Sequence, residues 1–333
     1  MPQLRKDPIR DRWVIIATDR ANRPNQFDAQ SVLSRRGPCP FCAGNEDMTP
    51  PEILARRPHG SEKSSWTLRV VPNKFPALIT EAGLKPCVDG IYDFVNGFGA
   101  HEVIIETPRH ESNMSALTDV ECEDAVAVYQ ERVSALKKDR RFRHILIFKN
   151  QGAAAGATIE HAHSQLIALP LVPQQIVEEL SSASIHYQSK GQCVYCDIVS
   201  QELKQGSRVV IEGDLFLVVC PFASRVPFET WILPKCHSPY FENAPEGECA
   251  ELARVLKATL RRLNRALSYP SFNSIIHSMP FDAPGREYYH WHIEILPKLA
   301  RVAGFEWGSG FYINPVTPEA AALSLRVEGE KPS

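Results

Sequence analysis

Residues 148–165 have the sequence FKNQGAAAGATIEHAHSQ. A strand rich in β-branched and aromatic residues is predicted to end at Asn150, a loop of small residues follows, and a second strand begins near the histidines. Side chains at positions i, i+2 and i+4 of a strand share one face. His161, His163 and Gln165 are therefore expected to point the same way, with neighbours roughly 6–7 Å apart.

The composition of this stretch favours phosphorus chemistry. Gly152 and Gly156 allow backbone N–H groups to approach an anion closely. A histidine with the ordinary pKa of about 6.5 is largely neutral and nucleophilic at pH 7, and its attack on phosphorus divides one difficult exchange into two easier steps. Gln165 cannot act as a general acid, but its amide can hold phosphate oxygens. Transfer between two phosphorylated partners is therefore favoured over hydrolysis. The alternative to any catalytic role is that these three polar residues of the strand merely face solvent.

The same order of motifs occurs twice along the chain. His237 stands 127 residues after His110, and His290 stands 129 residues after His161. Each half carries a C-x-x-C pair, a strand that leads to a histidine, a helix, and an H-x-H motif. The H-x-H motifs are 161–163 and 290–292, the C-x-x-C pairs are 39–42 and 193–196, and the expected helices span about 118–139 and 245–267. This order predicts a duplicated structural unit.

Predicted strands outnumber predicted helices. Ten strands are expected, and most of them are hairpin-like neighbours, which favours an α+β fold with antiparallel sheets over a parallel α/β fold. The stretch around 171–192, with Pro173 and a serine cluster, is expected to connect the two halves. The expected strands are 13–17, 68–71, 102–106, 144–149, 163–169, 208–211, 216–219, 230–233, 272–277 and 291–296.

Composition limits the class of protein. A chain of 333 residues suggests two domains at roughly 150 residues each. The net charge of -2 argues against a nucleic-acid binder, which is usually strongly basic. No signal peptide is visible, and no run of about 18 apolar residues occurs. We therefore expect a cytoplasmic location and no membrane partner. In that reducing compartment, nine cysteines with two C-x-x-C pairs favour metal or redox chemistry over disulfides.

The first C-x-x-C pair predicts a metal site. Cys39 and Cys42 have the spacing of a zinc knuckle, and two histidines would complete a closed tetrahedral site. The candidates are His110 and His161. Zinc on His161 would fix the position of His163, two residues further along the same strand. The alternative is a reduced pair without metal; a redox role is disfavoured because neither pair lies in a βαβ pattern.

These motifs together resemble the galactose-1-phosphate uridylyltransferase family of the histidine-triad superfamily. The resemblance rests first on H-x-H-x-Q after a glycine-rich loop and on the upstream C-P-F-C. It covers nearly the whole chain and implies two tandem histidine-triad-like domains, 1–175 and 190–333, with antiparallel sheets and flanking helices. The further matching segments are DP (7–8), WVI (13–15), RANRP (20–24), VPNKFP (71–76), YCDI (195–198) and ILPK (232–235).

The resemblance implies a role for each matched residue. His163 would attack the α-phosphorus of a nucleoside-diphosphate sugar and carry the nucleotidyl group, while a sugar 1-phosphate leaves. A second sugar 1-phosphate would then accept the nucleotide, which gives ping-pong kinetics. Gln165 would bind phosphate oxygens beside the nucleophile. The expected nucleotide- and phosphate-binding residues are Arg20, Arg23, Asn73, Phe75, Asn150, Gly156 and Thr158.

A second metal site is expected in the other half. In the family, this half holds a metal either with cysteine and histidine ligands or with glutamate and histidine ligands. The cysteines here favour zinc, and Glu179 and His277 are spare ligands for the other arrangement. His292 aligns with His163, but Glu294 replaces Gln165 and no comparable loop precedes it, so catalysis there is not expected. The cysteine-based ligand set is Cys193, Cys196, His237 and His290.

Two departures from the family pattern concern the substrates. The motif is His-Ala-His-Ser-Gln rather than His-Pro-His-Gly-Gln, and residues 304–314 lack the lysine and tyrosine pattern used on the hexose phosphate. This segment resembles a branch that includes ADP-glucose phosphorylases, which pass an adenylyl group to phosphate. We favour uridylyl transfer from UDP-glucose to galactose 1-phosphate, with ADP-glucose phosphorolysis as the alternative. The family resemblance also implies a homodimer. If the protein is not an enzyme, the alternative is a zinc-stabilised nucleotide-binding module.

Overall fold

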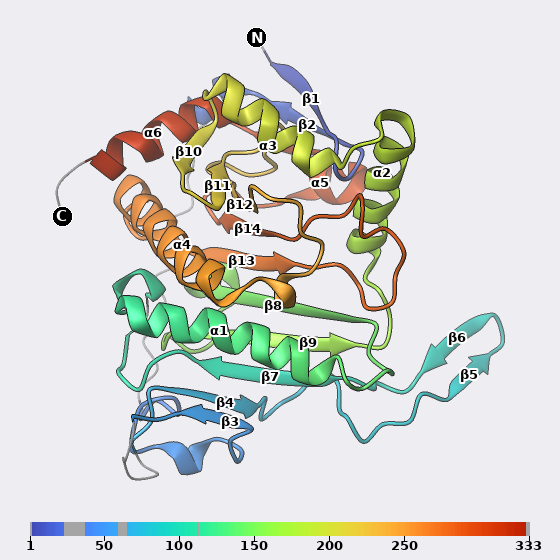
Figure 1. The fold of residues 1–333 in the computed structure, drawn as a ribbon, viewed down its shortest axis with the longest axis vertical. Coiled ribbons are helices and arrows are strands. Elements are labelled where there is room, and N and C mark those ends of the chain that lie inside the picture. Colours follow the sequence, from blue (N-terminus) through green and yellow to red (C-terminus); the bar gives the residue numbers. More distant parts are fainter. Residues whose placement is uncertain (1, 23–36, 59–64, 112, 331–333) are drawn as a thin grey trace.

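The computed structural model describes residues 2–22, 37–58, 65–111 and 113–330. Its main feature is a ten-stranded antiparallel sheet that runs through both halves of the chain (Figure 1). Across the sheet the strands are β10 (Val209–Glu212), β11 (Phe216–Val219), β12 (Thr230–Pro234), β14 (His292–Pro297), β13 (Phe272–His277), β8 (His144–Gln151), β9 (His163–Leu169), β7 (Ala100–Ile105), β4 (Leu68–Pro72) and β3 (Leu54–Arg56).

The strand order shows the internal repeat. Reading outward from the centre, β13-β14-β12-β11 in one half mirrors β8-β9-β7-β4 in the other. The two halves meet where β8 pairs with β13, with Asn150 opposite Asn273. The expected α+β class with antiparallel sheets is confirmed, and the sheets of the two halves are joined edge to edge into one.

One long helix from each half covers the same face of the sheet. Helices α1 (Asp119–Leu136) and α4 (Glu246–Leu267) lie side by side in front of it (Figure 1). Thr118 and Glu121 form the expected capping box at the start of α1, so backbone donors are satisfied there. Val126 and Leu260 belong to the core beneath the two helices, and burying a side chain of this kind contributes about 1.5–3 kcal/mol. The two helices leave the opposite face of the sheet uncovered. Because side chains alternate along a strand, His163 and Gln165 of β9 belong to that opposite face.

The stretch expected to connect the two halves, around 171–192, contains a helix that the sequence did not predict. This is α2 (Gln174–Lys190), and α3 (Val194–Gln205) follows directly. Ile176 and Ala183 of α2 are buried at helical spacing, and Pro173 serves as its N-cap residue rather than as a helix breaker. The serine cluster was misleading because tertiary burial of the apolar face outweighs the weak helix propensity of serine.

The remaining elements join the chain ends to the second half. Strands β1 (Gln3–Asp7), β2 (Arg12–Ile16) and β15 (Tyr312–Asn314) form a three-stranded sheet. Strands β5 (Pro86–Asp89) and β6 (Tyr92–Val95) form a hairpin that projects from the body (Figure 1). Helices α5 (Gly304–Ser309) and α6 (Pro318–Glu330) complete the C-terminal part. In the described part of the chain, no helix has the length and apolar character needed to span a bilayer.

Candidate active site

His163 is the first residue of β9 and is held in one orientation. Its Nδ1 lies 2.7 Å from the carbonyl oxygen of His161. Since a carbonyl can only accept a hydrogen bond, Nδ1 carries the proton and Nε2 keeps its lone pair. Burial, and next the nearby Lys149 ammonium, lower the pKa of His163 to about 4. The imidazole is therefore neutral near pH 7, as nucleophilic attack requires.

A buried polar network lies behind this histidine. Lys149 Nζ donates to the carbonyl oxygen of His163 at 2.9 Å and to Glu106 Oε2 at 2.7 Å. Glu106 Oε1 accepts hydrogen bonds from Ser164 (2.6 Å) and Tyr129 (2.7 Å). Burial alone would raise the pKa of Glu106, but Lys149 and these hydrogen bonds outweigh burial and lower it. The sequence analysis missed this network. Lys149 stands at an inward position of its strand where an apolar residue is expected, and this could have indicated a buried partner for its charge.

The amide of Gln165 is oriented by a second residue that sequence analysis missed, His101 on β7. The backbone N–H of Ala77 donates to His101 Nδ1 at 3.2 Å, so Nε2 carries the ring proton. Nε2 lies 2.9 Å from Gln165 Oε1 and donates to it. The oxygen of Gln165 is thereby engaged, and its NH2 group remains to donate to an anion. Asn73 Nδ2 lies 3.1 Å from the same His101 Nε2 but, since both are donors in this tautomer, the two form no hydrogen bond.

The glycine-rich loop is fixed by the second half of the molecule. Gly152 has φ of +78°, and a Cβ there would lie 2.2 Å from Ser271 Oγ, so only glycine fits without a shift. Asn273 Nδ2 donates both to Asn150 Oδ1 (2.7 Å) and to the carbonyl oxygen of Ala155 (2.9 Å). Asn273 is another residue that the motif did not reveal, because it lies far away in sequence and meets the loop only across the β8–β13 pairing.

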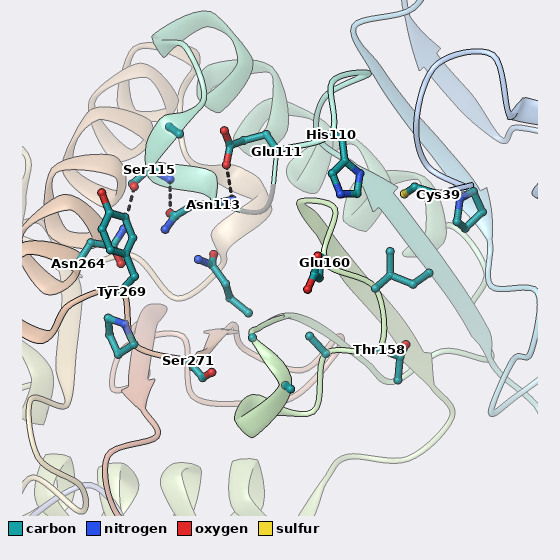
Figure 2. A pocket seen from close by; sticks show the side chains of 18 of the residues that line it. Cys39, His110, Glu111, Asn113, Ser115, Thr158, Glu160, Asn264, Tyr269 and Ser271 are labelled. Carbon is teal, nitrogen blue, oxygen red and sulfur yellow. Dashed lines mark hydrogen bonds between the residues drawn. The ribbon is translucent and has the colours of Figure 1, made fainter. Parts of the chain in front are cut away.

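A cavity of about 1410 Å³ lies against the glycine-rich loop. Figure 2 shows the side chains around this cavity, which are Thr158 and Glu160 of the loop, Cys39 and His110, and Asn264 and Tyr269 at the end of α4. Among the described residues, His163 and Gln165 do not line its wall. The cavity therefore gives access to Thr158 and to Cys39 and His110 of the metal-ligand cluster.

The other predicted binding residues are placed less tightly. Phe75 is 83% exposed and follows Asn73, whose Oδ1 accepts its backbone N–H at 2.9 Å. Arg20 is exposed in a short 3-10 helix after β2, which belongs to a different sheet from His163. No hydrogen bond among the described residues joins its side chain to the loop. Arg23 lies outside the described residues.

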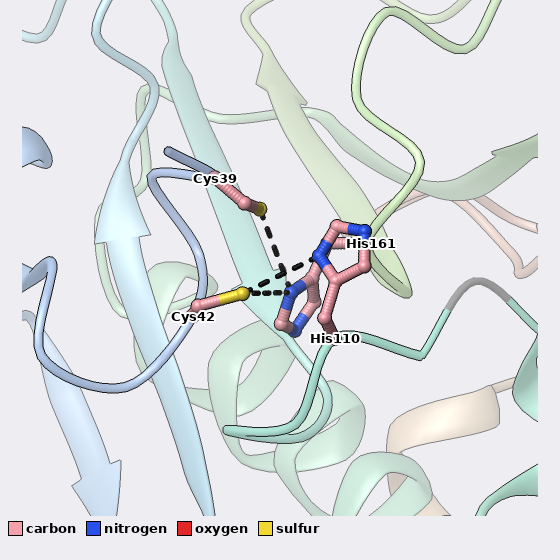
Figure 3. A group of neighbouring side chains, drawn as sticks. All are labelled: Cys39, Cys42, His110 and His161. Carbon is pink, nitrogen blue, oxygen red and sulfur yellow. Dashed lines mark hydrogen bonds between the residues drawn. The ribbon is translucent and has the colours of Figure 1, made fainter. Parts of the chain in front are cut away.

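The first predicted metal-ligand set is brought together. Cys42 Sγ lies 3.3 Å from His110 Nδ1 and 3.6 Å from His161 Nδ1, and Cys39 Sγ also lies 3.6 Å from His161 Nδ1 (Figure 3). Zinc bonds of about 2.3 Å to sulfur and 2.0–2.1 Å to nitrogen, at a tetrahedral angle, place S and N about 3.5 Å apart. The Nε2 atom of His161 lies 2.7 Å from the carbonyl oxygen of Thr107, which leaves Nδ1 for a metal. These four residues could hold one tetrahedral ion.

The second predicted set assembles in the same way. Cys196 Sγ lies 3.4 Å from His237 Nδ1 and 3.7 Å from His290 Nδ1. The Nε2 atoms of the two histidines face the carbonyl oxygens of Arg286 (2.7 Å) and Pro234 (3.1 Å). With Cys193, all ligand atoms of this set lie within 4.8 Å of one another. The second set therefore has the donors, the spacing and the ring orientation of the first.

The spare ligands form a separate buried group with His292. Glu179, His277 and His292 also offer ligand atoms within 4.8 Å of one another. However, Arg10 lies 2.7 Å from Glu179 and 2.8 Å from Glu294, so a guanidinium already neutralises these carboxylates. The cysteine-based set is the better metal site on electrostatic grounds, because it does not place an ion beside a buried cation.

The environment of His292 also differs from that of His163. His292 is fully buried and its ring stacks on that of His277 at 4.7 Å. Glu294 lies at the position of Gln165, and its carboxylate, which is paired with Arg10, has no N–H group to donate to a phosphate. This supports the expectation that only the first half carries a reactive histidine.

A fold of two repeated halves that holds a neutral histidine next to a glycine-rich loop suits nucleophilic attack on phosphorus. Comparison with known proteins agrees. The family model described as "Galactose-1-phosphate uridyl transferase, N-terminal domain" matches residues 1–173, and the model of the C-terminal domain matches residues 179–322. The chain therefore belongs to the galactose-1-phosphate uridyl transferase family of nucleotidyltransferases.

Individual relatives carry two different names. The chain is 36% identical to an ADP-glucose phosphorylase from Arabidopsis thaliana, over 98% of this chain and 92% of the relative. It is 28% identical to a galactose-1-phosphate uridylyltransferase from Thermotoga maritima, over 98% of both chains. A crystal structure of the Arabidopsis ADP-glucose phosphorylase with bound ADP-glucose covers all of both chains, with a TM-score of 0.85 and 34% identity. The comparisons establish the family and leave the base and the acceptor open.

Proposed function

We propose that the protein transfers a nucleotidyl group through a covalent intermediate on His163. Nε2 attacks the α-phosphorus of a nucleoside-diphosphate sugar, the N–P bond forms, and the P–O bond to the departing sugar 1-phosphate breaks. An acceptor phosphate oxygen then attacks the same phosphorus and releases Nε2. The observation that carries the proposal is the fixed Nδ1–H of His163, which leaves a neutral Nε2 beside the glycine-rich loop.

The surrounding residues are assigned to charge stabilisation. The NH2 group of Gln165, oriented by His101, would donate to a non-bridging phosphate oxygen. Asn150 is anchored through Oδ1 by Asn273, so its Nδ2 would donate in the same way. We assign Gly156 and Thr158 to the phosphate, and Asn73, Phe75, Arg20 and Arg23 to the nucleotide side, as the family pattern implies.

We assign zinc to both cysteine-histidine clusters. The ion in the first cluster would hold His161 and, through its carbonyl, the ring of His163. Zinc supplies a fixed tetrahedral anchor here, with no open coordination position for a substrate.

For the donor and acceptor we propose ADP-glucose and inorganic phosphate. Identity to the ADP-glucose phosphorylase is 36%, against 28% for the uridylyltransferase, and both alignments cover nearly the whole chain. Residues 304–314 also lack the lysine and tyrosine pattern for a hexose phosphate. Uridylyl transfer to galactose 1-phosphate, which the sequence analysis favoured, remains the second candidate, since the matching family models are those of uridylyltransferases.

The test is single-turnover labelling with ADP-glucose and UDP-glucose, each radiolabelled at the α-phosphorus, without acceptor. We expect acid-labile, alkali-stable label from ADP-glucose that is discharged by phosphate and absent from His163→Gly. Label from UDP-glucose that is discharged by galactose 1-phosphate would establish the second candidate. The covalent mechanism is rejected if neither donor labels the protein.

We also propose a homodimer. Phe305 and Trp307 of α5 are 48% and 80% exposed and so offer apolar surface that a second subunit could cover. In the family this segment reaches the active site of the partner subunit. Light scattering coupled to size exclusion should give twice the chain mass, and Trp307→Asp should shift it toward the monomer.

A further inference from the structure

Three backbone N–H groups of the glycine-rich loop already donate within the loop. Those of Ala155 and Ala157 donate to the carbonyl oxygen of Gly152 at 3.1 and 3.2 Å. That of Gly156 donates to the carbonyl oxygen of Ala153 at 2.9 Å. These groups close a tight 3-10 turn and are not available to an anion. A phosphate beside them therefore depends on side-chain donors.

Asn150 is well placed to be such a donor. Phe148, two residues earlier on β8, pairs with Gln165, so Asn150 lies on the sheet face that carries Gln165 and His163. Its Nδ2 lies 4.0 Å from the point that a Cβ of Gly156 would occupy, and it is the nearest heavy atom outside the adjoining residues. The space beside Gly156 is therefore open, and the Asn150 amide borders it. Which end of this amide faces the space decides whether it can bind a phosphate oxygen.

Asn273 sets that orientation from the second half of the chain. Its Nδ2 carries two hydrogens, and both have acceptors, Asn150 Oδ1 at 2.7 Å and the carbonyl oxygen of Ala155 at 2.9 Å. The bond to Ala155 fixes the Asn273 amide itself, because only its NH2 group can donate to a carbonyl. The bond to Asn150 then engages Oδ1 and leaves Nδ2 as the free end. An N–H donor at position 273 is what gives this arrangement.

The internal repeat offers a comparison for this contact. Gln165 and Glu294 occupy equivalent positions of the two H-x-H motifs. Gln165 lies opposite Phe148, and Glu294 lies opposite Ile275. Phe148 and Ile275 are therefore equivalent as well, and they pair with each other in the central β8–β13 pairing. The two halves are related to each other about this point.

Under this relation Asn273 has an apolar counterpart. Asn273 stands two residues before Ile275, and Leu146 stands two residues before Phe148. A leucine side chain donates no hydrogen bond, yet β8 and β13 pair on both sides of the central point. Strand pairing therefore does not require a side-chain donor at position 273. The donor is present on the side of the pairing that leads to the glycine-rich loop.

We propose that Asn273 is a positioning residue for nucleotidyl transfer. It holds Oδ1 of Asn150, so that Nδ2 of Asn150 donates to the phosphate during attack by His163. His101 holds the oxygen of Gln165 in the same way. The inference rests on the proposed function for the identity of the anion, whereas the hydrogen bonds that orient Asn150 do not depend on it. The half without a proposed nucleophile thus completes the phosphate site of the other half.

The first test is a double-variant cycle in single-turnover labelling at saturating donor. Asn273→Leu removes the N–H donor and introduces the side chain of the equivalent position. We expect it to slow labelling of His163 about ten- to a hundredfold, as should Asn150→Ala. Because Asn273 acts through Asn150, the double variant should be no slower than Asn150→Ala alone. Effects that multiply, or a wild-type rate in Asn273→Leu, would overturn the proposal.

A binding measurement separates this proposal from the proposed function. AMP and adenosine, and likewise UMP and uridine, are titrated calorimetrically into the full chain and into Asn273→Leu. We expect about tenfold weaker binding of the monophosphate and unchanged binding of its nucleoside. Equal weakening of both would indicate a general defect, and that result, or no weakening, contradicts the proposal. So does a wild type that binds neither monophosphate more tightly than its nucleoside.

The two tests fail independently. If no donor labels the wild type, the proposed function fails, and the titrations still decide the role of Asn273. Ser274→Ala is the matched control, because the next side chain of β13 alternates to the other face of the sheet, and it should label and bind like the wild type. If Asn273→Leu does not fold by circular dichroism, Asn273→Asp takes its place with the same expected results, since it keeps the shape of asparagine and has no N–H to donate.

Discussion

At the scale of single residues, the reactivity proposed for His163 would depend on neighbours that the motif does not contain. His101 fixes which end of the Gln165 amide faces the phosphate, because its Nε2–H engages Oε1. We expect His101→Ala to slow labelling of His163 about ten- to a hundredfold, since one oriented donor is lost. Rapid-quench single-turnover kinetics would measure this. His101→Gln, which can still donate an N–H, should recover part of the rate, and a wild-type rate in His101→Ala would contradict the assignment.

Lys149 and Glu106 form the buried ion pair behind the nucleophile. Removing one partner leaves an uncompensated charge, so Lys149→Met and Glu106→Gln should each lower the free energy of unfolding by about 3–5 kcal/mol. The double variant should lose less than the sum of the two, because no charge is stranded. Urea unfolding of the four proteins completes the cycle. Additive losses would show that the pair is not coupled in the folded protein.

At the scale of elements, the loop after β8 contains two glycines with positive φ, Gly152 and Gly156, whose surroundings differ. Gly152→Ala places a Cβ against Ser271, whereas the Cβ of Gly156→Ala meets only Asn150 Nδ2, at 4.0 Å. The second change should cost only the backbone penalty of about 1–2 kcal/mol. The first should cost more and displace the loop from Asn273. Thermal unfolding and labelling rates of both variants would check this, and equal effects would mean that contact with Ser271 does not define the loop.

The elements also show what sequence alone could supply. The strand at 163–169 and the helix with its capping box at 118–121 were predictable, because period-two and period-3.6 patterns and cap chemistry are local. The C-x-x-C pairs were recognised from their local spacing, whereas the histidines, which lie far from them in sequence, were chosen with the help of the repeat and the family resemblance. Helix α2 was missed because its burial against the second half is a tertiary effect. His101 and Asn273 were missed because each meets its partner only across the assembled sheet.

At the scale of the whole molecule, two similar clusters serve two unlike histidines. His161 and His290 are both proposed metal ligands, and each precedes a histidine by two residues. The carbonyl of His161 holds the ring of the proposed nucleophile His163, whereas the carbonyl of His290 faces Nδ1 of the fully buried His292 at 3.2 Å. We therefore expect each cluster to hold one zinc ion, and only the ion of the first cluster to affect the rate at which His163 is labelled.

Matched ligand substitutions test this asymmetry. Metal analysis should give two zinc ions per wild-type chain and one in either Cys39→Ser or Cys193→Ser. Cys39→Ser should slow labelling of His163 at least about tenfold, because the support of its ring is loosened. Cys193→Ser should unfold at lower temperature yet label at close to the wild-type rate, since its cluster anchors α3 rather than the nucleophile. The opposite result, in which Cys193→Ser stops labelling while the fold and the first zinc persist, would mean that the two halves are coupled through the shared sheet. That coupling would pass through the central β8–β13 pairing, where Asn150 is bonded to Asn273.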